Sequence, residues 1–324
     1  MLIDRRTFTR QGAAALAAIS LGVQAQAWPE RPVRVISPYG PGGSNDISAR
    51  IIAEEIGKRL GQQFNVENRP GAGTRLANEA VARAQPDGYT LLYAAAPFAI
   101  GESMYPKLPY DIRKDFQPVT LCVLGPVFLV VSAERPFHNV NELIAYGKGK
   151  PDGLTFASPG AGSGPHLAAE LLFKEAGVKG LNVHYRGDAT AYTELLAGRV
   201  DATMTAITSA LPHIQSGKLR VIGVAAEERS PIYPQAATLR EQGLTNVVGY
   251  GWFGFIAPAA TPKPVVERLQ AEVNRALRDA NLRQRLLAIG LQPRGGTPGE
   301  FATFIDAEAR KWGEIVRSAN IKGD

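Results

Sequence analysis

The stretch VRVISPYGPGGSNDISARIIAEEIGKRL, from Val33 to Leu60, decides the fold of this chain. Its first four residues, Val33 to Ile36, alternate and are rich in β-branched side chains, which is typical of a strand. Prolines and glycines from Pro38 to Gly43 then interrupt regular structure. Ser44 to Asp46 are residues that start helices, and apolar side chains recur behind them at helical spacing. The pattern predicts a strand, a glycine loop and the N-terminus of a helix.

A second loop of the same kind reads SPGAGSGPH, from Ser158 to His166. It follows a predicted strand at Leu154–Ala157 and opens a predicted helix at Leu167–Ala176. A helix N-terminus offers unpaired backbone N–H groups and the positive end of the helix dipole to an anion. One such loop is most often an ordinary connection between a strand and a helix. Two of them, one in each half of the chain, predict a cleft in which each helix end holds a carboxylate.

Strand and helix patterns alternate along most of the chain, which indicates the α/β class with parallel strands. One such unit covers residues 33–93 and a second covers residues 126–228. A long strand pattern from Phe116 to Ser132, interrupted at Gly125 and Pro126, predicts a crossing between two lobes. We therefore expect lobe I to hold residues 28–125 and 229–324, and lobe II to hold residues 126–228. The ligand cleft is expected between two parallel-rich sheets.

The N-terminus predicts export. Arg5 and Arg6 form a twin-arginine pattern, an apolar stretch follows from Ala13 to Val23, and Ala25-Gln26-Ala27 has the form of a cleavage site. Residues 1–27 are thus predicted to be a twin-arginine-type signal peptide of a periplasmic protein. Cys122 is the only cysteine, so an intramolecular disulfide is excluded. The net charge of +6 is spread thinly and without basic runs, which argues against a nucleic-acid partner.

Patterns typical of enzymes are incomplete. Ala161 stands where a nucleophile elbow around Ser163 would need glycine, and the loop at Gly40 lacks the lysine of a phosphate loop. The four histidines show no spacing typical of zinc ligands. We expect no catalytic residues, no metal and no cofactor. A periplasmic hydrolase or isomerase that uses Ser163, His166 and Asp46 remains the alternative from a different class.

Several motifs in order resemble the Bug family, the periplasmic substrate-binding receptors of tripartite tricarboxylate transporters. They are PYGPGGSNDISAR from Pro38, ENRPGAG from Glu67, PDGYTLL from Pro86 and GAGSGPHLAAELL from Gly160. The resemblance implies a two-lobed periplasmic binding protein of type II, with a Venus-flytrap fold. It also implies that a small organic carboxylate is closed between the lobes and gripped by the loops Tyr39–Asp46 and Ser158–His166. Arg75 departs from the small residues usual after NRPGAG, and this affects the expected ligand.

The resemblance implies a di- or tricarboxylate, an amino acid or an aromatic acid as the ligand. The expected partners are the membrane subunits of a tripartite transporter or, alternatively, a sensor protein, and the receptor is expected to be a monomer. The predicted ligand site combines both loops, a third loop after the strand at Tyr89–Ala94, and polar residues near later strands. Its residues are Tyr39, Gly42, Gly43, Ser44, Asn45, Asp46, Ala96, Pro97, Ser158, Ala161, Gly162, Ser163, His166, Arg186, Thr190 and Asp201.

Overall fold

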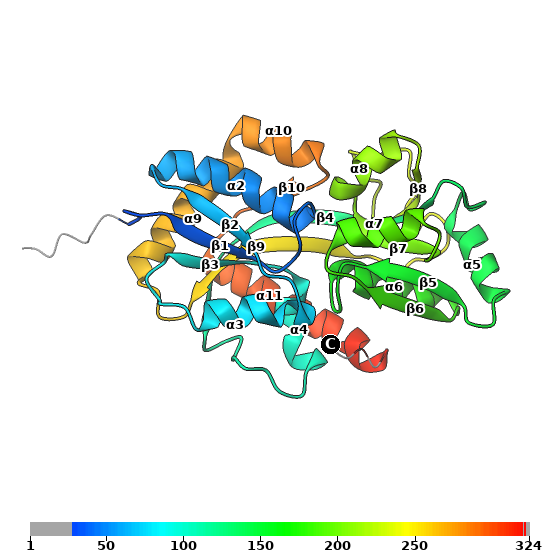
Figure 1. Ribbon diagram of the computed structural model, residues 1–324, viewed down its shortest axis with the longest axis horizontal. Helices are drawn as coiled ribbons and strands as arrows, with labels where there is room; N and C mark the ends of the chain where they lie inside the picture. Colours follow the sequence, from blue (N-terminus) through cyan, green and yellow to red (C-terminus); the bar gives the residue numbers. More distant parts are fainter. Residues whose placement is uncertain (1–27, 320, 322–324) are drawn as a thin grey trace, which may run out of the picture.

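The computed structural model describes residues 28–319 and residue 321, so the predicted signal peptide lies outside the described residues. Two lobes lie side by side along the long axis of the molecule (Figure 1). Lobe I is built from residues 28–126 together with residues 250–319 and 321, and lobe II is built from residues 127–249. The predicted fold class, a two-lobed α/β binding protein, is confirmed.

Lobe I contains three parallel strands, two antiparallel ones, a short edge strand and most of the helices. Its elements in chain order are β1 (Val33–Ser37), α2 (Ser44–Leu60), β2 (Phe64–Asn68), the 3-10 turn η1 (Ala72–Thr74), α3 (Arg75–Ala82), β3 (Thr90–Ala94), α4 (Ala96–Met104), the first part of β4 (Phe116–Ser132), β9 (Tyr250–Pro258), α9 (Lys263–Arg278), α10 (Ala280–Ala288), β10 (Gln292–Pro293) and α11 (Pro298–Ser318).

Lobe II repeats the alternation of strands and helices. Its elements are the second part of β4, then α5 (Val140–Lys148), β5 (Leu154–Ser158), α6 (Gly164–Ala176), β6 (Gly180–His184), α7 (Asp188–Leu196), β7 (Ala202–Ala206), α8 (Ile207–Gln215) and β8 (Leu219–Ala225).

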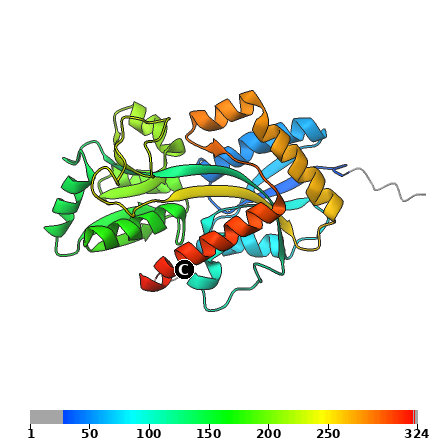
Figure 2. The same cartoon turned by 180° about the vertical axis from the view of Figure 1, so that it is seen from behind.

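Eight strands of the described residues form a path of hydrogen-bonded neighbours in the order β2-β1-β3-β9-β4-β7-β5-β6, and β8 and β10 pair with β4 off this path. The strands β1, β2 and β3 are parallel in lobe I, and β5, β6 and β7 are parallel in lobe II. Antiparallel pairs surround β4 and β9 in the middle of the path. The two parallel-rich sheets are therefore joined through β4, and Figure 2 shows this long strand extending from one lobe into the other.

Two details differ from the sequence prediction. The strand Phe116–Ser132 is not interrupted at Gly125 and Pro126, because both residues continue the antiparallel pairing with β9. The return to lobe I was predicted at residue 229, whereas the following segment stays with lobe II as far as residue 249. Leu239 N–H donates a hydrogen bond to the carbonyl oxygen of Val224 in β8 (2.8 Å), and Leu244 and Val247 belong to the core of this lobe. This segment has no regular helix or strand, so no periodicity marks where it packs.

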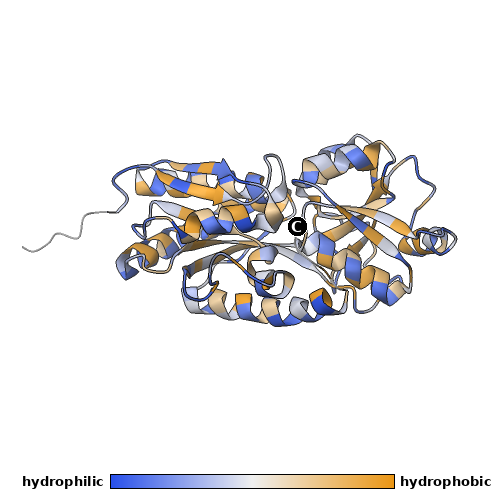
Figure 3. Ribbon diagram, turned by 60° about the horizontal axis from the view of Figure 1, so that its bottom comes forward, coloured by the Kyte–Doolittle hydropathy of each residue, from blue (hydrophilic) through white to orange (hydrophobic). Residues whose placement is uncertain are grey.

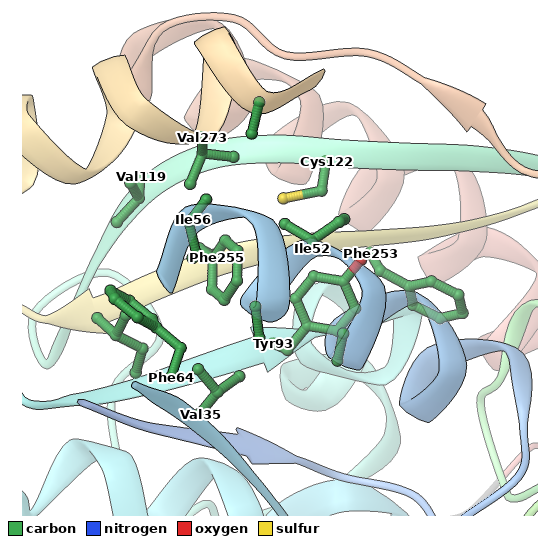
Figure 4. Packing of buried hydrophobic residues seen from close by; sticks show 14 of the residues in the cluster. Val35, Ile52, Ile56, Phe64, Tyr93, Val119, Cys122, Phe253, Phe255 and Val273 are labelled. Atoms are coloured by element: carbon green, nitrogen blue, oxygen red, sulfur yellow. The ribbon is translucent and has the colours of Figure 1, made fainter. Parts of the chain in front are cut away.

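The core of lobe I lies between the sheet and the helices α2 and α9. Ile52 and Ile56 of α2 and Val273 of α9 meet Tyr93 and Phe255 of the sheet (Figure 4). These side chains are fully shielded from solvent. Burial of side chains of this size stabilises the lobe by about 1.5–3 kcal/mol each, so α2 is firmly seated with its N-terminus at the edge of the sheet.

The helices carry hydrophilic and hydrophobic residues in alternation, while the strands between them are largely hydrophobic (Figure 3). The predicted amphipathic helix near the C-terminus shows this directly. Its apolar residues Val266, Leu269, Val273 and Leu277 are all buried in α9. The second predicted helix is α11, which lies across the end of lobe I and contacts α6 of lobe II.

Glu308 of α11 fastens this helix to the sheet. Its Oε2 atom accepts hydrogen bonds from the indole N–H of Trp252 in β9 (3.1 Å) and from that of Trp312 (2.9 Å). Glu308→Ala would leave two buried N–H donors without an acceptor, and we expect a loss of about 1–3 kcal/mol in the free energy of unfolding. Urea denaturation measures this loss. Glu308→Gln keeps an acceptor oxygen and should lose much less; equal losses in the two variants would contradict this role.

Candidate functional site

A cavity lies between the lobes, at the ends of strands. The loops after β1, β3, β5 and β6 and the last residue of β7 reach it, because the carboxyl ends of parallel strands share one edge of their sheet. Residues of β4 and β9 close the cavity on its remaining side. The lining residues are Tyr39, Gly43, Ser44, Asn45, Ala95, Ala96, Val127, Pro159, Ser163, Gly164, Pro165, Gly187, Asp188, Ala206, Gly251, Trp252 and Phe253.

The first loop is shaped by the side chain of Asn45. Its Oδ1 accepts a hydrogen bond from Ser37 Oγ (2.7 Å), and its Nδ2 donates to the carbonyl oxygen of Tyr93 (3.2 Å). Both partners are buried at the ends of β1 and β3. Asn45 therefore fixes the start of α2 to the sheet, and the neighbouring Gly43 and Ser44 are left facing the cavity.

Asp46 stabilises the same loop through further hydrogen bonds. It accepts hydrogen bonds from Gly42 N–H (3.0 Å), Asn68 Nδ2 (2.8 Å) and Arg50 Nε (3.0 Å). Burial alone would raise the pKa of Asp46, but these hydrogen bonds, led by that of Arg50, hold it below its usual value. Asp46 is thus an ionised residue that supports the loop, and it does not line the cavity.

The second loop places Ser163 at the start of α6. Ser163 Oγ caps the helix by accepting a hydrogen bond from His166 N–H (3.3 Å), and His166 Nδ1 accepts one from Gly162 N–H (2.9 Å). The imidazole of His166 therefore stabilises the backbone of the loop. The His166 ring does not bond Ser163 Oγ, because its Nδ1 accepts from Gly162 N–H and its Nε2 lies 3.5 Å from Glu170 Oε1. The predicted alternative, an enzyme with Ser163 as nucleophile and His166 as base, lacks the contact that such a pair needs.

The two lobes touch each other beside the cavity. Gly40 N–H of lobe I donates to the carbonyl oxygen of Arg186 in lobe II (3.2 Å), and Ser44 N–H donates to Asp188 Oδ2 (3.3 Å). A further contact joins α8 of lobe II to the end of α10 in lobe I, where Thr208 Oγ1 donates to the carbonyl oxygen of Ile289 (2.6 Å). The cavity is therefore enclosed by both lobes.

The structure brings together part of the predicted site. Six predicted residues line the cavity: Tyr39, Gly43, Ser44, Asn45, Ala96 and Ser163. Two more, Ala161 and Arg186, line a groove that opens beside it and shares Tyr39 with it. The others are outside both hollows: Gly42, Asp46, Pro97, Ser158, Gly162, His166, Thr190 and Asp201.

The residues outside the hollows have other partners or positions. Pro97 is buried in the first turn of α4, and Thr190 is exposed on α7. Ser158 Oγ lies 2.7 Å from His184 Nδ1. Asp201 precedes β7, at the end of the sheet remote from the cavity, and binds Lys150 Nζ (2.8 Å) and Thr155 (2.9 Å to N–H and to Oγ1). The sequence predicted Asp201 to be part of the ligand site, but in the structure it lies at the end of β7 that is remote from the cavity.

Sequence reasoning missed Asp188 and the floor of the cavity. Gly187 and Asp188 follow β6 and start α7, so the same pattern of strand, glycine and helix start was available for them. Burial raises the pKa of Asp188. The floor residues Val127, Trp252 and Phe253 lie within β4 and β9. No sequence motif marks these floor residues. They face the cavity only because β4 and β9 pass between the two lobes.

Two α/β lobes that enclose a cavity at their strand ends form the architecture of a solute-binding receptor of the periplasmic type. The family model described as "Tripartite tricarboxylate transporter family receptor" matches residues 48–321 of this chain. The chain belongs to this family of receptors, as the sequence motifs indicated, and these receptors are not enzymes. The family works in the periplasm.

Individual relatives agree with this assignment. Protein BugT of Bordetella pertussis is 34% identical over 310 residues, which cover 95% of each chain. A solved structure of an R. palustris protein with adipate has a TM-score of 0.88 and 30% identity, and covers 91% of this chain and 99% of that one. MatC from Rhodopseudomonas palustris, solved with malate, has a TM-score of 0.83 and 34% identity, and covers 89% of this chain and all of that one (100%).

In the described part of the chain, none of the helices is both long and apolar enough to span a bilayer. Within the same residues, no three side chains of His, Cys, Asp or Glu are grouped so as to hold a metal ion.

Asp201→Asn tests whether Asp201 belongs to the structure or to the ligand site. We expect the free energy of unfolding to fall by about 1–3 kcal/mol, because the charged bonds to Lys150 and Thr155 are weakened. Ligand affinity, measured by calorimetry, should be unchanged. A tenfold loss of affinity would instead show that Asp201 is part of the ligand site.

The pH dependence of stability gives a second readout of the same variant. Burial opposes ionisation of Asp201, but the bonds from Lys150 and Thr155 hold its pKa below the usual value. Its stabilising effect is therefore present above the unfolded-state pKa of about 3.9 and disappears as the pH falls through the lower folded-state pKa. Asp201→Asn should make the stability of the protein less sensitive to acid in that range.

Proposed function

We propose that this receptor captures a small organic carboxylate in the cavity between its lobes and delivers it to the membrane subunits of a tripartite transporter. The observation that carries the proposal is the convergence of two helix N-termini, those of α2 and α6, on one cavity. The adipate and malate bound in the two similar structures support an acid as the ligand class. A di- or tricarboxylate, an amino acid and an aromatic acid all belong to that class.

Backbone groups supply the attraction for the acid. The first N–H groups of a helix have no partner within the helix; in α2 these include the N–H of Asn45 and that of Ser44, which already donates to Asp188 Oδ2 (3.3 Å). Gly164 offers a first-turn N–H at the start of α6. None of the described residues that line the cavity is a lysine, arginine or histidine. The ligand is therefore held by helix ends, with the hydroxyl groups of Tyr39 and Ser163 as further contacts.

The remaining parts of the proposal concern the route and the assembly. The receptor is exported by the twin-arginine route and acts as a monomer, because one chain alone encloses the cavity from both sides. Delivery to a transporter is preferred to docking on a sensor protein, because the matching family is one of transporter receptors.

A thermal-shift screen of mono-, di- and tricarboxylates, amino acids and aromatic acids tests the function. A ligand present at 100 times its dissociation constant adds about 2.7 kcal/mol of stability, which is easily detected. We expect at least one acid to raise the melting temperature and none to be converted. Turnover of an acid that Ser163→Ala abolishes would contradict the receptor function, and so would a complete lack of binding.

Gly43→Val tests whether the first loop holds the acid. The backbone of Gly43 is extended, with φ of −82°, so valine is sterically allowed there and the protein should still fold. A Cβ atom at this position would lie 3.1 Å from Asp188 Oδ2, and the larger side chain would push the lobes apart. We expect an affinity loss of at least about tenfold in calorimetry, since the ligand could no longer touch both lobes.

Gly299→Val is the matched control, because a Cβ atom at Gly299 has no neighbour within 4 Å. It should bind the acid as the wild type does. If Gly43→Val folds and binds equally well, the loop at Gly43 does not hold the carboxylate.

A further inference from the structure

Asp188 is a buried carboxylate in the wall of the cavity. It is the first residue of α7, and only 6% of its surface is exposed. Its Oδ2 atom accepts hydrogen bonds from Ser44 N–H (3.3 Å) and Ser44 Oγ (3.5 Å), and its Oδ1 atom accepts one from Thr205 Oγ1 (3.5 Å). Asp188 of lobe II thus reaches the N-terminus of α2 in lobe I.

Asp188 differs from other buried acids of the chain in having no cationic partner. Asp46 is paired with Arg50 (2.9 Å), and Asp201 is paired with Lys150 (2.8 Å) and Arg135 (3.5 Å). Within residues 28–319 and 321, no lysine, arginine or histidine lies within 4.0 Å of the Asp188 carboxylate. A buried carboxylate is costly unless it is paired and hydrogen-bonded, so a positive charge or a further strong donor beside Asp188 would lower that cost.

The same carboxylate changes what the helix end of α2 can bind. Two carboxylates that share one buried site repel each other, and one of them must then take up a proton. A ligand carboxylate placed beside Ser44 would meet this repulsion from Asp188. The end of α6, at Ser163 and Gly164, has no acidic residue among the described residues that line the cavity near it. A single ligand carboxylate is therefore favoured at α6 and disfavoured at α2.

We propose that Asp188 determines the specificity of this receptor by selecting acids that carry a hydrogen-bond donor, an ammonium or an amide N–H, at the end opposite their carboxylate. The inference rests on the proposed function, because it assigns the two ends of the acid within the same cavity. The ligand carboxylate lies at the start of α6, and the donor group faces Asp188. Between these ends the walls are apolar, with Val127, Ala206 and Phe253, and accept an uncharged middle part of the ligand.

Calorimetry with ligands of matched length tests the assignment. Succinate, glutarate and adipate are compared with the monoamide and the ω-amino acid of the same chain length, at neutral pH and constant salt. The monoamide replaces one carboxylate by a neutral group of the same shape that donates hydrogen bonds. We expect the donor-bearing acid of the best-fitting length to bind at least about tenfold more tightly than the dicarboxylate, because it meets the Asp188 carboxylate without repulsion.

Asp188→Asn removes the charge but keeps an oxygen that accepts the hydrogen bond from Ser44 N–H. This variant should lose the preference, with the dicarboxylate gaining affinity and the ω-amino acid losing it. Asp188→Ser provides a second neutral variant if the asparagine variant fails to fold. Asp152→Asn is the control, because it removes one negative charge at an exposed position of the same lobe and should leave the preference unchanged.

The outcomes separate the inference from the function on which it rests. If the wild type prefers dicarboxylates and Asp188→Asn leaves that preference unchanged, Asp188 does not select the ligand, and the carboxylate receptor stands. If no acid of either kind binds to the wild type or to the variants, the proposed function fails and the selection by Asp188 fails with it.

Discussion

The arrangement of this receptor depends on one strand, β4, which passes without a break from lobe I into lobe II. Its first part pairs with β9 and its second part with β7 and β8, so each lobe contains a piece of the same strand. The parallel strands of both lobes are thereby aligned with their carboxyl ends toward the space between the lobes. Helix N-termini, glycine loops and the cavity follow from this alignment, because loops that leave the ends of parallel strands meet at one edge.

Most polar side chains near the cavity support its loops and leave the backbone to face the ligand. Asn45 and Asp46 bind the sheet and the loop beneath α2, and His166 binds the loop before α6. Such buried groups are costly unless their hydrogen bonds are made, so they fix the positions of the helix ends. Asp188 is the exception, because it bridges the lobes and also presents its carboxyl group to the cavity.

The sequence predicted the fold well, because strand and helix patterns are local and the glycine loops mark where strands end. It predicted the long strand across the lobes, but it placed an interruption at Gly125 that the pairing with β9 removes. The candidate site was predicted in part. Tyr39, Ser44 and Ser163 lie in its wall, whereas Asp201 lies at the opposite end of its strand. Residues of β9 such as Trp252 were missed. They reach the cavity only because of where the folded chain places this strand, and the local sequence does not show that.

The central claim is that one acid is enclosed at once by the helix ends of both lobes. Hydrogen exchange of the protein with and without a bound acid tests it most directly, because it reports on individual backbone N–H groups. The account predicts that the acid slows exchange in peptides covering residues 39–48 of lobe I and in peptides covering residues 159–168 of lobe II. Slower exchange confined to one lobe, at a saturating concentration of an acid that binds, would contradict the account.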